Sequence, residues 1–176
     1  MSAEIIELED VDGLGAGAVG VPGQRAYYIQ ARTEHTQLTV LVEKEQVDLL
    51  ATEAVAFLDQ IAEKYPELPF DLPPTQSSLR EPTVPLFRAR LIGLGFDTER
   101  ELVLLELRER SQEEEEVDDA VDDEEPEGYV ARIYATRAQV RAMAARGAEA
   151  VAGGRPPCPL CEQPMDPSGH RCPRWN

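Results

Sequence analysis

Four residues with metal-binding side chains lie close together near the end of the chain. Cys158 and Cys161 form a Cys-x-x-Cys pair, and His170 and Cys172 follow after eight intervening residues. The group includes all three cysteines of the protein and one of its two histidines. Zn²⁺ prefers four nitrogen or sulfur ligands in a tetrahedron, and a Cys-x-x-Cys turn can place two thiolates on one metal. The pattern therefore predicts one Zn²⁺ held by these four side chains.

The sequence around the four residues favours a structural role for this zinc. Turn-forming residues fill the connection between the two ligand pairs, namely Pro164, Asp166, Pro167, Ser168 and Gly169. The segment 154–176 is too short to bury a core of its own, so metal binding, which contributes roughly 10–16 kcal/mol in zinc-finger peptides, would order it. Because four protein ligands leave no position open for water, we expect a structural and not a catalytic metal.

Three other states of the cysteines remain open at this stage. A disulfide would leave one of the three cysteines unpaired, and disulfides are typical of secreted proteins. A redox-active Cys-x-x-Cys pair is expected to open a helix after a strand, whereas here residues 153–157 read Gly-Gly-Arg-Pro-Pro and Pro164 follows the pair. Thiols without any ligand are the third alternative.

Basic and aromatic side chains surround the predicted zinc site. They are Arg155, Arg171, Arg174 and Trp175, and they form the one locally basic, aromatic patch in the sequence. Closed zinc modules commonly present a surface to a protein or a nucleic acid, so this patch is a candidate partner-binding surface. The alternative is that Trp175 packs on the module and the arginines only cover its edge.

The sequence before the predicted zinc module indicates two similar units. Residues 38–47 correspond to residues 131–140 at an offset of 93, which aligns Val40 with Ile133 and Val47 with Val140. The upstream segments 18–25 and 93–100 also correspond, and each precedes an apolar strand candidate. We therefore expect an internal repeat, with a first strand-strand-strand-helix unit at 11–65 and a second at 86–153.

Apolar periodicity places the helices of the two units. The first is expected at about 44–65, with an apolar stripe along one face and an end before Pro66. The second is expected at about 137–152, where Thr136 and Gln139 have capping-box spacing and Gly153-Gly154 ends the helix. Alternating apolar residues predict the strands. The expected fold is α+β, an antiparallel sheet packed on two helices, followed by a small C-terminal zinc ribbon at 154–176.

Two segments do not fit a folded element. Residues 66–85 contain six of the fourteen prolines and predict an extended linker between the units. The predicted loop at 111–128 holds eleven acidic and no basic residues between positions 113 and 127. These residues account for most of the chain's net charge of −17. Such a block is expected to be solvated and disordered, and the alternative is an acidic arm that docks on a basic partner. The overall acidity disfavours direct binding of nucleic acid.

Other features exclude several classes of protein. No apolar run approaches the 18 residues of a membrane span, and residues 1–10 lack the pattern of a secretory signal, so a cytoplasmic location is expected. His35 is expected at the exposed tip of a hairpin. The glycine-rich run at 13–20 resembles a dinucleotide-binding loop only superficially, because it does not follow a strand or open a helix.

The ending of the chain also carries a family resemblance. Gly154-Arg-Pro-Pro-Cys-Pro-Leu-Cys161, followed by Gly169-His170 and Cys172-Pro-Arg174, resembles the ending of an uncharacterised actinobacterial family of the DUF3090 type. The stretches 19–25 and 42–47 are similar to two other islands of that family. The resemblance implies no known activity. It also implies Gly after the second cysteine, where this chain has Glu162, so the first turn of the site should be less tight.

The sequence supports one leading hypothesis and two alternatives. The leading hypothesis is a non-enzymatic binding or adaptor protein that docks on an unidentified protein partner through its zinc ribbon, because no catalytic motif accompanies the closed metal site. The first alternative is a nucleic-acid-associated protein that uses the ribbon and the repeated sheet. The second is a small enzyme with a cleft between the two units.

Overall fold

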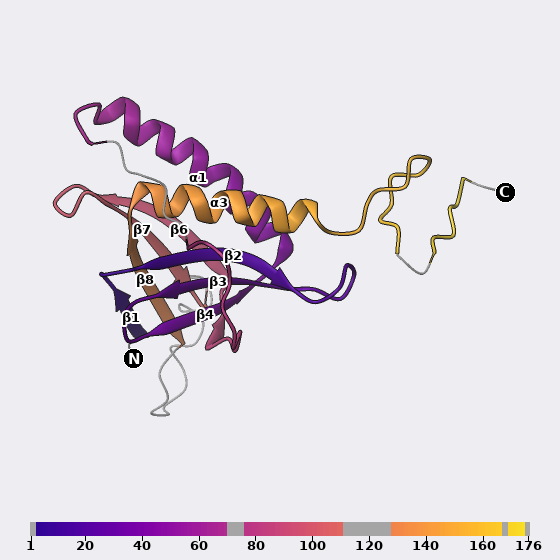
Figure 1. Cartoon of the computed structure of the whole chain (residues 1–176), viewed down its shortest axis with the longest axis horizontal. Coiled ribbons are helices and arrows are strands. Elements are labelled where there is room, and N and C mark those ends of the chain that lie inside the picture. Colours follow the sequence, from indigo (N-terminus) through magenta and orange to yellow (C-terminus); the bar gives the residue numbers. More distant parts are fainter. Residues whose placement is uncertain (1–2, 70–75, 111–127, 167–168, 175–176) are drawn as a thin grey trace, which may run out of the picture.

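The computed structural model describes residues 3–69, 76–110, 128–166 and 169–174 (Figure 1). Two helices are present in these ranges, α1 (Lys44–Lys64) and α3 (Arg137–Ala152). The strands are β1 (Glu4–Leu8), β2 (Gly13–Val19), β3 (Ala26–Arg32), β4 (Gln37–Val42), β5 (Phe87–Arg88), β6 (Leu91–Asp97), β7 (Leu102–Arg108) and β8 (Tyr129–Ala135). The expected α+β class and both helices are confirmed.

The strands form two four-stranded sheets. One has the order β1-β8-β7-β6 and the other the order β2-β3-β4-β5. The pairs β1–β8 and β4–β5 are parallel, and the remaining pairs are antiparallel. This corrects the expectation of one antiparallel sheet. Strands β1 and β5 were not predicted, because β1 carries Glu4 and Glu7, β5 has only two residues, and both pair with strands far away in the chain.

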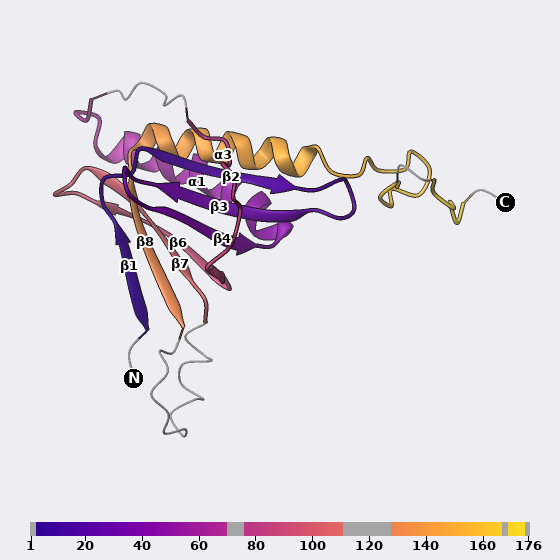
Figure 2. The same cartoon turned by 60° about the horizontal axis from the view of Figure 1, so that its bottom comes forward.

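Each half of the chain supplies a strand to the sheet of the other half, and β1 lies before the predicted first unit at 11–65. Strand β1 precedes β2 along the chain yet pairs with β8 of the second unit, and β5 precedes β6 yet pairs with β4 of the first. The helices follow the same rule, because α3 packs on β2 and α1 contacts β6 as well as α3 (Figure 2). The order of elements is thus the same in both halves, while their internal duplication and the boundaries 11–65 and 86–153 stay a prediction.

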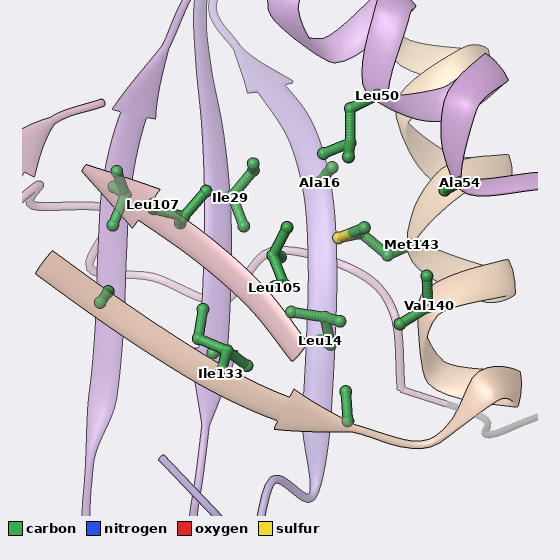
Figure 3. Packing of buried hydrophobic residues seen from close by; sticks show 14 of the residues in the cluster. Leu14, Ala16, Ile29, Leu50, Ala54, Leu105, Leu107, Ile133, Val140 and Met143 are labelled. Atoms are coloured by element: carbon green, nitrogen blue, oxygen red, sulfur yellow. The ribbon is translucent and has the colours of Figure 1, made fainter. Parts of the chain in front are cut away.

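The core fills the space between the two sheets and reaches the inner faces of the helices (Figure 3). Leu105 and Ile133 of one sheet meet Leu14 and Ile29 of the other, and Met143 of α3 closes the cluster. All five side chains are at most 1% exposed. These side chains pack the two sheets against one another.

Strand β2 explains the glycine-rich run of the sequence. Leu14 and Ala16 point into the core, and the glycines alternate with them on the outer face. A Cβ atom added to Gly15 would lie only 2.4 Å from the carbonyl oxygen of Ser77, and one added to Gly17 would lie 3.1 Å from Leu79 Cδ1. The glycines therefore let a second stretch of chain cross the sheet at close range.

That crossing stretch, residues 76–82, is the described end of the predicted linker. Buried polar side chains of β3 hold it, because Arg32 donates to the carbonyl oxygen of Ser78 (3.0 Å) and Gln30 Nε2 donates to that of Arg80 (2.8 Å). This end of the predicted linker is bound to the sheet. Residues 70–75 lie outside the described part of the chain, as do residues 111–127 of the predicted acidic loop.

Two further expectations concern the exposure of His35 and the presence of membrane-spanning helices. His35 lies between β3 and β4 with its side chain 85% exposed, as expected for a hairpin tip. Within the described ranges, no helix has the length and apolar character needed to cross a bilayer.

Candidate metal centre

The four predicted ligands converge at the end of a segment that leaves the body of the protein after α3 (Figures 1 and 2). The ligand atoms of Cys158, Cys161, His170 and Cys172 all lie within 4.8 Å of one another. Cys158 Sγ lies 3.9 Å from Cys172 Sγ, and Cys161 Sγ lies 3.2 Å from His170 Nε2. Residues up to fourteen positions apart therefore form one compact cluster.

Two short turns bring the ligand pairs together. In the first, the Cys158 N–H donates to the carbonyl oxygen of Gln163 (2.8 Å) and the Glu162 N–H donates to that of Cys158 (2.8 Å). In the second, the Gly169 N–H donates to the carbonyl oxygen of Asp166 (3.0 Å). Single-residue β-bridges pair Pro157 with Pro164 and Asp166 with Gly169, as a small ribbon requires.

The backbone of the first turn favours the thiolate form of Cys158. The N–H groups of Cys161 and Leu160 hydrogen-bond to its sulfur, and they lower the pKa of Cys158 to about 6. The thiolate and not the thiol binds metals. The turn thus favours the ligand form of Cys158. At Cys161 the hydrogen bond from the Gln163 N–H lowers the pKa, but burial and the neighbouring Cys158 outweigh it and raise the pKa above its ordinary value.

The cluster has the geometry of a metal site. In a tetrahedral zinc site with bonds of about 2.3 Å to sulfur, two sulfurs lie about 3.8 Å apart, close to the 3.9 Å between Cys158 and Cys172. These two cysteines are only 5% and 8% exposed. All three cysteines are free of disulfide bonds. The arrangement is a Cys₃His cluster that could hold one metal ion.

Glu162 occupies a strained position in this site. Its φ angle is +62°, in the left-handed region that glycine adopts without cost and other residues adopt reluctantly. This is the position after the second cysteine, where the resemblance implies Gly and this chain has Glu. The departure therefore has a backbone consequence.

The predicted partner-binding arginines have different roles in the structure. Arg155 forms an ion pair with Asp166 at 2.9 Å, and Arg174 donates to the carbonyl oxygen of Leu160 at 3.1 Å. Arg171 is exposed. Trp175 lies outside the described part of the chain. Arg155 and Arg174 thus each hold two parts of the module together, while Arg171 and Arg174 are both exposed.

Sequence reasoning missed a cleft beside the module. Its volume is about 440 Å³, and it lies between the β2–β3 turn, the start of α1 and the Gly154-Arg155 pair. Its basic lining residues are Arg25, Lys44, Arg88 and Arg155. Because these come from separate segments, no local motif could have revealed them.

The fold and the site together define an α+β protein with a C-terminal Cys₃His cluster that could hold one metal ion. The chain matches the family model described as protein of unknown function DUF3090 over residues 6–172, and it therefore belongs to this family. The resemblance read from its ending is thus confirmed. No curated protein and no solved structure matches the chain.

Proposed function

We propose that the protein is a non-enzymatic binding or adaptor protein, with a zinc module as its docking surface. The observation that carries the proposal is the closed donor set of the Cys₃His cluster. Four protein ligands leave no coordination position for water or substrate, so the metal would hold the module in shape and would not perform chemistry.

The donor set supports zinc as the metal. Three thiolates and one imidazole are soft and borderline ligands, which favour Zn²⁺ over the oxygen-preferring Mg²⁺ and Ca²⁺. The 3.9 Å between Cys158 Sγ and Cys172 Sγ is close to the separation of two sulfurs bound to one tetrahedral zinc.

The position of the module supports docking. It follows α3 through Gly153-Gly154 and extends beyond the sheets, so its surface is accessible to another protein (Figure 1). We assign the contact with the partner first to Arg171, and then to the exposed Arg174 and to Trp175, which follows it in the sequence. Arg174 donates to a backbone carbonyl group, and no carboxylate of the described residues pairs with its charge, whereas Arg155 is paired with Asp166. Exposed arginines next to an aromatic residue suit a partner that presents carboxylates.

Affinity capture with the full-length, zinc-loaded protein tests this proposal. We expect one partner to be retained by the wild type and lost with Arg171→Glu and with Cys158→Ser. Arg141→Glu is the matched control, because Arg141 is an exposed arginine on α3, away from the module. Retention of the same partner by Arg171→Glu would contradict the assigned surface, and robust turnover of a metabolite by the purified protein would overturn the non-enzymatic role.

A further inference from the structure

The cleft beside the metal module concentrates positive charge in an acidic protein. Four of the 17 basic residues line it, namely Arg25, Lys44, Arg88 and Arg155, against the carboxylates of Glu43 and Glu45. The chain as a whole has a net charge of −17. A local excess of cations inside a concave site is a feature of anion binding.

Two of the four cations have carboxylate partners at the rim. Arg88 forms an ion pair with Glu43, and Arg155 pairs with Asp166. Arg25 donates to the carbonyl oxygen of Ala150 (2.9 Å), and its buried Nε has no hydrogen-bond partner.

Lys44 is the cation without such a partner. No carboxylate of the described residues lies within ion-pair distance of it. Its ammonium group lies next to Gly154, since a Cβ atom added to that glycine would be 3.0 Å from Lys44 Nζ. Lys44 is also the first residue of α1, where the helix dipole favours an anion. The cleft thus has more positive charge than its own carboxylates neutralise.

The cleft joins the body of the protein to the metal module. On one side are Arg25 and Lys44, and on the other is Arg155. The β2–β3 turn touches the module here, because a Cβ atom added to Gly23 would lie 3.2 Å from Asp166 Oδ1. A ligand in the cleft would contact both parts at once.

The size and the walls of the cleft indicate the kind of anion. A volume of about 440 Å³ lies within the range of small-molecule sites, roughly 300–1,000 Å³, and exceeds what a bare phosphate needs. Tyr27, Leu41 and Val42 supply an apolar wall. Guanidinium groups bind phosphate oxygens in pairs, and an ammonium adds a point charge.

We propose that this cleft binds a phosphorylated small molecule, with its phosphate among Arg25, Lys44 and Arg155 and its organic part against the Tyr27 wall. This site is separate from the docking surface at Arg171. Ligand binding would fix the metal module against the body of the protein.

Isothermal titration calorimetry of the full chain at low ionic strength tests the site. The probes are ribose 5-phosphate and inorganic pyrophosphate, with ribose as the uncharged control. We expect saturable binding of both phosphates with Kd at or below about 1 mM, and none of ribose. Lys44→Ala should weaken binding about tenfold, because it removes a charged hydrogen-bond donor.

The second lysine of the chain provides the matched control. Lys64 lies at the opposite end of α1 and is also exposed, so Lys64→Ala should leave both affinities unchanged. Arg171→Glu should also bind the phosphates normally, so failure of the docking surface and failure of this site are distinguishable. No saturation by either phosphate up to about 10 mM would overturn the proposal. Equal weakening by Lys44→Ala and Lys64→Ala would also overturn it, since it would show only general screening.

Discussion

Gln46 and Gln139 make the same pair of contacts at positions 93 residues apart. Gln46 Oε1 accepts the Glu43 N–H (2.8 Å), and Gln139 Oε1 accepts the Thr136 N–H (2.9 Å), so each glutamine closes the start of its helix. Each amide nitrogen then donates to a carbonyl oxygen in front of a strand of the other unit.

Those two carbonyl groups are equivalent in the two halves. Gln139 Nε2 donates to Val11 (2.6 Å), just before β2, and Gln46 Nε2 donates to Ala89 (3.2 Å), just before β6. This correspondence of side-chain contacts, together with the exchanged strands, supports our proposal that the two units arose by internal duplication. It also gives both glutamines a role in stability.

Gln139→Ala should lower the free energy of unfolding by about 1–3 kcal/mol, because it removes the glutamine half of the capping box and leaves the Val11 carbonyl group without its donor. Gln139 is only 8% exposed, whereas Gln46 is half-buried, so Gln46→Ala should cost less. Chemical denaturation measures both. Gln60→Ala, at an exposed position of α1, is the control and should be nearly neutral. Wild-type stability for Gln139→Ala would contradict the structural role.

The sequence predicted what depends on neighbouring residues. Thr136 and Gln139 predicted the start of the second helix, because a capping box spans only four consecutive residues and can be recognised from them alone. The metal ligands were predictable for the same reason, since few residue types bind zinc and the two pairs have short spacings. Neither prediction needed knowledge of the sheets.

Features that depend on distant pairing were not predictable. Strand β5 has two residues and exists because Val40 and Leu41 of β4 lie beside it. The glycines of β2 make sense only once residues 76–82 cross them. The basic cleft brings Arg25 and Arg155 together from positions 130 residues apart. Contacts between such distant residues produce no recognisable motif or apolar periodicity within a single segment of the sequence.

The crossing of β2 by residues 76–82 gives a prediction about glycines. Gly15→Ala should destabilise the protein by about 1–3 kcal/mol, because the new methyl group would meet the Ser77 carbonyl oxygen and the backbone would have to shift. The control is Gly93→Ala in β6, where an added Cβ atom has no neighbour within 4 Å. Thermal and chemical denaturation should show Gly93→Ala at or slightly above wild-type stability. Equal stability of the two variants would refute the close crossing.

The positive φ angle of Glu162 predicts that replacing this residue with glycine increases the affinity of the site for zinc. Glu162→Gly should stabilise the folded module by about 1 kcal/mol, because glycine adopts the left-handed conformation without strain. The measurement is competition for zinc with a chelator, where the variant should retain the metal several-fold better. Gln163→Gly, one residue along and also exposed, should not improve retention. A Glu162→Gly variant that loses zinc more easily would contradict this assignment.

Glu106 predicts a pH dependence of stability. Burial raises the pKa of Glu106, but hydrogen bonds from Arg108 Nε (2.7 Å) and Arg132 Nε (3.0 Å) outweigh it and hold the pKa below its ordinary value. A carboxyl group with a lowered folded-state pKa stabilises the protein above its unfolded pKa of about 4.3, and this contribution is lost as the pH falls through the folded-state value.

Glu106→Gln should therefore be less stable than the wild type at pH 7. The difference in free energy of unfolding should shrink as the pH is lowered through the acid range, since the wild-type carboxylate then becomes protonated. Urea denaturation at a series of pH values checks this. A difference that stays constant or grows toward acid pH would contradict the ion-pair assignment.

Native mass spectrometry with metal analysis of the untagged protein tests the central claim, the structural zinc site. The account predicts one zinc per chain. It also predicts that Cys158→Ser loses the metal while circular dichroism shows the two sheets and both helices still folded, because the core does not include the module. A wild-type protein without zinc, whose three cysteines all react freely with a thiol reagent, would contradict it.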